Sequence, residues 1–255
     1  MEKLHNLTSS TFVKIIVYLG MTLKEIVTYF KKKRNLANIK GMAYFGITAK
    51  TAYGLSMPDV RKLAKKIGTD HTLAQKLYNT GSLEGKILAS IIDDPRLVTE
   101  KQMESWIKDF DSWAVTDAAT TILFDQTKFA WKKAVEWTKR EPEYEKRAGF
   151  TIVAGLAVHD LVSTDAKFEA FYPYIKKGAT DERNFVKKAV NWALRNIGKR
   201  SRGLNKSAIK LSEELLKIDS SSAKWIARDA IRELKSATAK RRIKASERKR
   251  KQKLR

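Results

Sequence analysis

Apolar residues recur along most of the chain at the three- and four-residue spacing of amphipathic helices. Within residues 185–197 the apolar positions fall on one arc of a helix at about 100° per residue: Phe185, Val186, Ala189, Val190, Ala193, Leu194 and Ile197. The sequence contains no sustained alternation of apolar and polar residues and no Asn-Gly or Asp-Gly hairpin turn. The pattern therefore predicts an all-α chain.

Proline positions and helix-capping residues set the expected boundaries. The four prolines, at 58, 95, 142 and 173, each fall where one helical pattern gives way to the next. The candidate N-caps are Ser56, Thr99, Asp111 or Ser112, Asp181 and Ser220. The expected helices span residues 10–19, 21–34, 56–67, 70–79, 83–92, 99–109, 112–124, 127–139, 143–160, 165–176, 182–198, 205–217 and 220–235.

From about residue 56 these helices pair into units the length of HEAT-type helical repeats. Helix pairs that cannot bury both faces alone must stack, which predicts a curved solenoid with a concave face for an extended ligand. We expect capping helices in residues 1–35, a HEAT-like repeat domain in 36–235, and a basic tail in 236–255. The tail is expected to be disordered, because so charged a segment buries little apolar surface.

The charge indicates a polyanionic partner. The chain has 52 Lys and Arg against 28 Asp and Glu, a net charge of +24. Residues 240–255 carry ten basic side chains and one acid, Glu247, so +15 of the net charge remains on residues 1–239. Nucleic acid and an anionic membrane are the usual partners of such a field, and an acidic protein is a weaker candidate. We expect a basic concave face.

Several function classes are excluded by the residues that are missing. The chain has no cysteine and only three histidines, His5, His71 and His159, without zinc-ligand spacing, so neither a metal nor a cofactor is expected. The apolar stretch 15–21 is too short to span a bilayer, and the first residues lack the order of an export signal. We expect a soluble, cytoplasmic protein that joins the nucleoid when it binds DNA.

Trp113 and Asp117 lie one helical turn apart on the side opposite the apolar stripe of residues 115–122, so both are predicted to face outward. An exposed indole forgoes roughly 1.5–3 kcal/mol of burial, which favours a contact surface. An aspartate beside it could hold a charged centre. The alternative is an ordinary solvated carboxylate.

A second candidate surface follows the helix expected at 182–198. Lys188, Trp192, Arg195 and Lys199 lie along the face opposite its apolar arc. Cations around an aromatic ring are typical of a nucleic-acid contact, and the alternative is a solvated face with one half-buried tryptophan. The other tryptophans are expected in packing: Trp106, Trp131, Trp137 and Trp225.

Arg147 lies in a helix so rich in apolar and small residues that it is expected to be central. A cation in such a place needs an anion. Two interpretations stay open: a structural salt bridge with Asp117 or another acid, or a phosphate clamp made by the guanidinium. His159 and Asp160 lack the strand-turn-helix context of a nucleophilic triad.

Four segments together carry a family resemblance: YGLSMPDVRKLAKKIG (53–68), SWAVTDAA (112–119), KRAGFTIVAGLA (146–157) and FVKKAVNWALRNIGKR (185–200). In this order and spacing the chain resembles the AlkD-type DNA alkylation repair glycosylases, an all-helical HEAT-like family, over residues 41–235. The resemblance implies that Asp117 is the catalytic aspartate and that Trp113 and Trp192 contact the sugar. It also implies that Arg147 is the active-site arginine.

The resemblance implies further contacts and one departure from the family. Arg195 matches a DNA-backbone contact, and we expect Lys188 and Lys199 on the same face to bind DNA with it. Where the family commonly has a second acid after the first tryptophan, this chain has Ala114.

The implied activity is hydrolysis of the N-glycosidic bond of cationic alkylated purines, chiefly 3-methyladenine and 7-methylguanine, in double-stranded DNA. The family reads the DNA backbone without a base-recognition pocket, and we expect a monomer. Two alternatives stay open. One is a non-catalytic HEAT-like protein that binds or shapes DNA, and the other is an RNA- or ribosome-associated scaffold that uses the basic tail.

Overall fold

The computed structural model describes residues 21–47 and 51–254, and every regular element in those two ranges is a helix. In chain order they are α1 (Leu23–Lys32), α2 (Leu36–Tyr44), α3 (Met57–Ile67), α4 (His71–Tyr78), α5 (Leu83–Ile92), α6 (Glu100–Ile107), α7 (Trp113–Ala118), the π-helical η1 (Ala119–Leu123), the 3-10 turn η2 (Phe124–Gln126), α8 (Ala130–Trp137), α9 (Glu143–His159), α10 (Asp165–Glu169), α11 (Tyr172–Gly178), α12 (Asn184–Gly198), α13 (Arg202–Leu215), α14 (Ser221–Leu234) and α15 (Ala237–Lys253). The helix expected at 10–19 lies outside the described residues.

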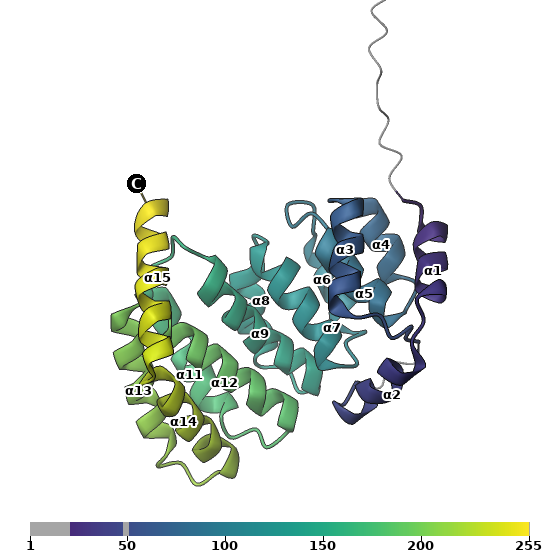
Figure 1. Ribbon diagram of the computed structural model, residues 1–255. Helices are drawn as coiled ribbons and strands as arrows, with labels where there is room; N and C mark the ends of the chain where they lie inside the picture. The colour runs from purple at the N-terminus through teal and green to yellow at the C-terminus, as the bar shows by residue number, and fades with distance from the viewer. Residues whose placement is uncertain (1–20, 48–50, 255) are drawn as a thin grey trace, which may run out of the picture.

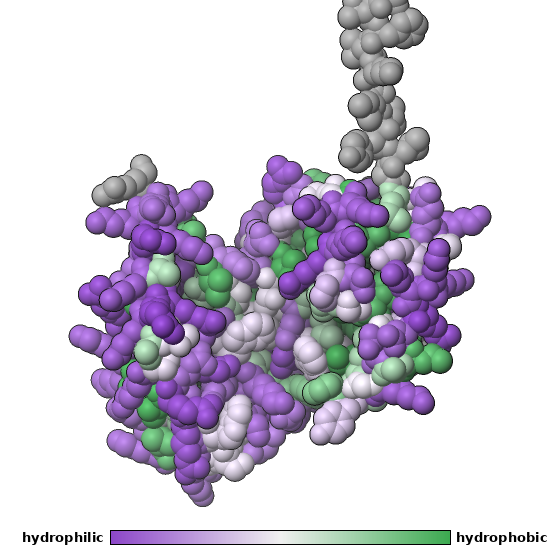
Figure 2. Space-filling model, in the orientation of Figure 1, coloured by the Kyte–Doolittle hydropathy of each residue, from purple (hydrophilic) through white to green (hydrophobic). Residues whose placement is uncertain are grey.

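The helices stack into an arc that runs from α1 and α3 at one end to α13, α14 and α15 at the other (Figure 1). Figure 2 shows a hollow between the two arms of this arc, with hydrophilic residues covering most of the α15 arm. The expectation of an all-α, HEAT-like stack is confirmed.

Helix α9 is the centre of the stack because its middle is buried from all sides, from Arg147 to Ala157. It packs against α8 on one side and α12 on the other. Small residues allow this. A Cβ atom at Gly149 would lie 2.3 Å from the backbone nitrogen of Thr138, so the end of α8 touches the α9 backbone.

Helix α12 buries most of the arc that its spacing predicts. Val186, Ala193 and Ile197 are fully buried in the core, as are the apolar residues between them. Phe185 at the first turn is half-buried and packs on Tyr144 of α9, with ring centroids 5.6 Å apart. The opposite face of α12 is therefore left for other contacts.

Two expected helices are interrupted. The segment 112–124 leaves α-helical geometry after Ala118 and continues as a π-helix and a 3-10 turn. The segment 165–176 divides into α10 and α11 on either side of Ala170 and Phe171, with Pro173 in the first turn of α11. Apolar spacing does not register such breaks, because the buried positions stay on the same side of the chain.

The N-terminal segment contains a helix, α2, that the sequence did not predict. Asn35 caps it, because its side chain accepts a hydrogen bond from the backbone N–H of Asn38. None of its residues is buried, so it lacks the apolar stripe on which the prediction depended.

The expectation of a disordered tail is wrong: residues 237–253 form helix α15. Ala239 and Ile243 are buried, and the Arg250 guanidinium donates to Asp165 at 2.9 Å and to the carbonyl oxygen of Ser163 at 3.2 Å. Glu247, the acid of this segment, accepts from the backbone N–H of Arg202 at 2.9 Å. These four residues share one side of the helix, and that spacing is hidden in the sequence by the surrounding lysines and arginines.

A buried carboxylate holds the loop that leads into α3. Glu84 of α5 is 1% exposed and accepts hydrogen bonds from the backbone N–H groups of Tyr53, Gly54 and Leu55 at 2.9, 2.6 and 3.1 Å. Gly54 has a φ of 78°, and a Cβ there would lie 2.2 Å from the carbonyl oxygen of Asn35. The loop thereby joins the N-terminal helices to the repeats.

We expect Glu84→Gln to lower the free energy of unfolding by about 2–4 kcal/mol, because an amide presents an N–H to buried N–H groups that need an acceptor. Urea denaturation measures this change. The same substitution at exposed Glu169 is the control and should stay within about 0.5 kcal/mol of the parent. Equal effects at the two positions would contradict the role assigned to Glu84.

Candidate active site

A two-pronged ion pair joins α7 to α9. The Arg147 Nε and Nη2 atoms donate to the two carboxylate oxygens of Asp117 at 2.9 and 2.8 Å, and Nη1 donates to the carbonyl oxygen of Phe185 at 2.6 Å. The Arg147 side chain is 7% exposed and that of Asp117 is 20% exposed. Of the two interpretations that the sequence left open for Arg147, the salt bridge with Asp117 is the one observed.

Burial and the ion pair act on Asp117 in opposite directions. Removal from water raises the pKa of the Asp117 carboxyl, and the Arg147 guanidinium offsets part of that rise. The result is a carboxylate that is fixed in orientation and a better proton acceptor than a solvated aspartate.

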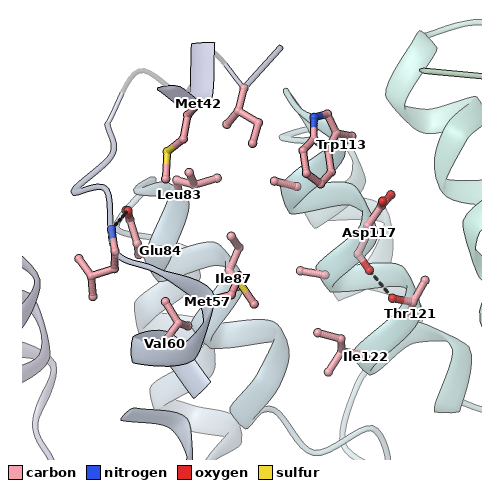
Figure 3. A pocket seen from close by; sticks show the side chains of 14 residues that line it. Met42, Met57, Val60, Leu83, Glu84, Ile87, Trp113, Asp117, Thr121 and Ile122 are labelled. Carbon is pink, nitrogen blue, oxygen red and sulfur yellow. Dashed lines mark hydrogen bonds between the residues drawn. The ribbon is translucent and has the colours of Figure 1, made fainter. Parts of the chain in front are cut away.

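The backbone around Asp117 is irregular. The π-helix η1 begins two residues after it, and single π-turns inside helices are frequent at functional sites. Threonines stabilise the break: Thr120 and Thr151 share a hydrogen bond of 2.8 Å between η1 and α9, and Thr121 donates to the carbonyl oxygen of Asp117 at 2.8 Å (Figure 3). The hydroxyl contacts hold α7 and α9 in the register that the ion pair requires.

Trp113 is fixed by the N-terminal segment. Its indole Nε1 donates to the carbonyl oxygen of Phe45, just after α2, at 2.8 Å. The ring is half-buried and lines a cavity together with Asp117. The prediction that both residues face outward is therefore wrong. Both lie on the wall of this cavity, which Met42 and Ile47 also line.

The cavity has a volume of about 280 Å³ and is almost entirely apolar. Figure 3 shows Trp113, Asp117 and Ile122 on one side and Met42, Met57 and Ile87 on the other. The remaining lining residues are Ile47, Leu55, Val60, Leu83, Glu84, Ala114, Ala118 and Thr121. Ala114, which stands where the resembled family commonly has an acid, adds a methyl group to this apolar lining.

The predicted basic face of α12 is only partly free. Lys188 is exposed. Arg195 forms ion pairs with Glu233 and, at 3.4 Å, with Asp229, and the Lys199 ammonium donates to Glu233 at 2.5 Å. Burial lowers the pKa of Lys199. Two of the three cations predicted to bind DNA on this face are thus already paired, because α14 packs alongside with its acids directed at α12.

Trp192 stands apart from the ion pair. It is half-buried on α12, on the face that also carries Lys188, Arg195 and Lys199. Among the described residues no hydrogen bond or ring contact joins it to Trp113 or Asp117. The structure brings Trp113, Asp117 and Arg147 together and leaves Trp192 outside this cluster.

Comparison with known proteins identifies the family. A model of the family described as DNA alkylation repair enzyme matches residues 26–234. The chain belongs to this family. A search of the curated proteins found no match to this chain.

One solved structure shares the fold, with a TM-score of 0.70 and 21% sequence identity over 83% of this chain and 95% of the other. Its description is of a new family of proteins related to the HEAT-like repeat DNA glycosylases with affinity for branched DNA structures. The similarity shows that this chain has the HEAT-like fold. Within the described residues no helix is long and apolar enough to cross a membrane.

Sequence reasoning missed the N-terminal contribution to the site. Met42, Phe45 and Ile47 line the cavity or bind Trp113, and a Cβ at Gly46 would lie 2.7 Å from the Phe185 ring. The segment 37–54 has no periodic pattern. Two of its glycines, Gly46 and Gly54, have positive φ angles of 76° and 78°, and a glycine in the sequence is a signal for such a backbone conformation.

We expect Arg147→Gln to lower the free energy of unfolding by about 3–5 kcal/mol at neutral pH, because Asp117 is left as an unpaired, half-enclosed charge. Without Arg147 the pKa of Asp117 rises further, so the variant's folded state binds a proton that the parent's does not. The deficit should therefore grow as the pH rises above the Asp117 pKa of the folded parent, which lies above the ordinary aspartate value of about 3.9.

Denaturation at pH 4 and pH 7 measures this dependence. Adding Asp117→Asn should recover part of the loss at pH 7 in a double-mutant cycle. A deficit that is the same at both pH values would show that the ion pair does not hold the site together.

Proposed function

We propose that this chain is a DNA glycosylase that hydrolyses the N-glycosidic bond of cationic alkylated purines in double-stranded DNA. One observation carries the proposal: an aspartate carboxylate fixed by a buried arginine on the wall of a cavity, one helical turn from a half-buried indole. The positions match those of the catalytic aspartate and the first sugar-contacting tryptophan in the AlkD-type glycosylases that the sequence resembles.

The chemistry suits a lone carboxylate. A purine alkylated at N3 or N7 carries a positive charge, and it leaves with the electron pair of the glycosidic bond as a neutral base. The deoxyribose then bears the developing positive charge, which Asp117 stabilises at short range. Water adds to C1′ and passes a proton to the carboxylate, whose pKa is raised by burial.

The aromatic side chains hold the sugar. Indole faces carry negative potential and attract a cation, so Trp113 at the cavity and Trp192 on α12 would contact the cationic deoxyribose. The hydrogen bond from Trp113 to the Phe45 carbonyl fixes the ring for this contact.

Arg147 acts through Asp117. Its Nε, Nη1 and Nη2 atoms already donate to protein acceptors, which argues against the phosphate clamp considered from sequence. We assign it the role of a positioning residue that orients the carboxylate and keeps it ionised.

The partner is duplex DNA, bound by a monomer in the hollow of the arc. Lys188 offers an exposed cation next to the site, and Arg195 and Lys199 contribute donors whose charge is balanced by α14. The long-range field of a chain with a net charge of +24 steers the polyanion to this surface.

A second candidate is a binding protein for branched DNA without glycosylase activity. It is favoured by the affinity for branched DNA structures in the description of the solved structure of the same fold. The full use of both Asp117 oxygens by Arg147 also fits a structural pair.

We expect Asp117→Asn to reduce release of 7-methylguanine from methylated duplex DNA by about 100-fold or more, since the charge that stabilises the sugar is lost. Chromatography of the released base measures the rate. Asp111→Asn, at an exposed carboxylate six residues earlier, is the matched control and should keep the parent rate. Binding without release by the parent protein would favour the branched-DNA candidate.

We expect release of 3-methyladenine and 7-methylguanine and no measurable release of hypoxanthine or uracil from the same duplex. A neutral base leaves as an anion and needs a proton. Among the described lining residues, Glu84 accepts three backbone N–H groups and the Thr121 hydroxyl donates to the Asp117 carbonyl, so neither supplies one. Comparable rates for neutral and cationic lesions would refute a mechanism in which Asp117 acts without a proton donor for the leaving base.

A further inference from the structure

A second cavity, of about 280 Å³, lies where α15 crosses the ends of α9 and α12. Three of its lining residues are cationic, Lys199, Arg242 and Lys249, and no carboxylate is among the described lining residues. The others are Ala157, Val158, Leu161, Asn196, Ala245 and Ser246. Its charge and its hydroxyl and amide groups suit a phosphate oxygen better than a nonpolar ligand.

The free positive charge in this cavity comes from α15. Glu233 of α14 already pairs with Lys199. In the part of the chain that the structure describes, no carboxylate lies within ion-pair distance of Arg242 or Lys249, and both are exposed. They are seven residues apart and so lie on one face, with Ser246 between them.

Helix α15 presents this face because its other side is anchored. Ala239 and Ile243 are buried, and Arg250 pairs with Asp165. Eight basic residues of the helix remain exposed: Lys240, Arg241, Arg242, Lys244, Arg248, Lys249, Lys251 and Lys253. Because the backbone is already ordered, a ligand bound here does not bear the entropic cost of folding a disordered tail.

Lys199, one of the lining residues, relates the cavity to Trp192, the proposed nucleotide contact on α12. Lys199 follows Trp192 by seven residues on the same face of α12, which is about 10.5 Å along the helix axis. Base pairs are about 3.4 Å apart along each strand of a duplex, so this distance corresponds to about three base pairs. Figure 1 shows α15 in the arm of the arc that lies opposite α3 and α6.

We propose that the cavity between α9, α12 and α15 binds a backbone phosphate of duplex DNA about three base pairs from the nucleotide at Trp192. The Arg242 guanidinium and the Lys249 ammonium neutralise the phosphate, and Ser246 donates its hydroxyl. The inference rests on the proposed function for the identity of its ligand. The family match ends at residue 234, so α15 is an addition to the shared domain of this family.

The test compares two double variants of the full chain with the same change in charge. Arg242→Gln with Lys249→Gln empties the cavity of free cations, whereas Arg241→Gln with Arg248→Gln removes two exposed cations outside it. Fluorescence anisotropy with an unmethylated duplex at several salt concentrations gives the affinity and its salt dependence. Thermal unfolding of each variant verifies that α15 stays docked, since neither pair touches the anchoring residues.

We expect the cavity pair to weaken duplex binding about tenfold or more at 0.1 M salt and to reduce the salt slope by about one, for one phosphate contact. The control pair should weaken binding less than threefold. Equal weakening by both pairs would overturn the proposal, because it would assign the effect to net charge. Tighter binding of a duplex RNA than of DNA by the parent would overturn it as well.

Base release separates this proposal from the proposed function. With saturating methylated DNA, the cavity pair should keep the parent kcat and raise KM. If the parent binds DNA without releasing base and the two double variants still differ in affinity, the proposed glycosylase activity is refuted and the phosphate site is supported. If the parent releases base and the two double variants bind DNA equally, the glycosylase activity is supported and the phosphate site is refuted.

Discussion

The two-pronged ion pair between Asp117 and Arg147 is the constraint around which the candidate site is arranged. It joins α7 to α9, and through the Phe185 carbonyl it extends to the start of α12. A buried pair of this kind contributes little net stability, but it fixes geometry, because any other placement leaves a charge unpaired in a region with little water. The Thr120–Thr151 hydrogen bond and the π-helical turn beside it follow from the same need to align two helices.

The opposing effects on the Asp117 pKa connect this geometry to chemistry. An aspartate in water is a weak base, and its carboxylate is not held in one orientation. Burial in an apolar wall raises its pKa, and the guanidinium limits the rise by favouring the ionised form. In the proposed reaction the site stabilises a transient cation and then accepts a proton from water, and it needs both properties together.

Much of the fold could be predicted from residue spacing, because the arc of α12 and the bounds of helices such as α5 follow from which positions must be buried. Asp117 and Trp113 could be singled out by type and spacing. The shape of the wall they occupy could not. It depends on the π-helix after Ala118 and on the unpatterned segment that brings the Phe45 carbonyl to Trp113. The order of α15 was hidden for a related reason, since Ala239 and Ile243 are two apolar contacts within a basic run.

The bond between Trp113 and Phe45 joins residues 68 positions apart in the chain. In a stack of helical repeats most contacts are between neighbouring units, so folding can begin at several places and spread. The hydrogen bond from Trp113 to Phe45 instead joins segments that are not neighbours along the chain. The indole becomes fixed only when the segment after α2 and helix α7 have come together, so assembly of the site depends on docking of the N-terminal segment onto the stack. A fragment that begins after Phe45 can retain the central helices and still lack a correctly held ring.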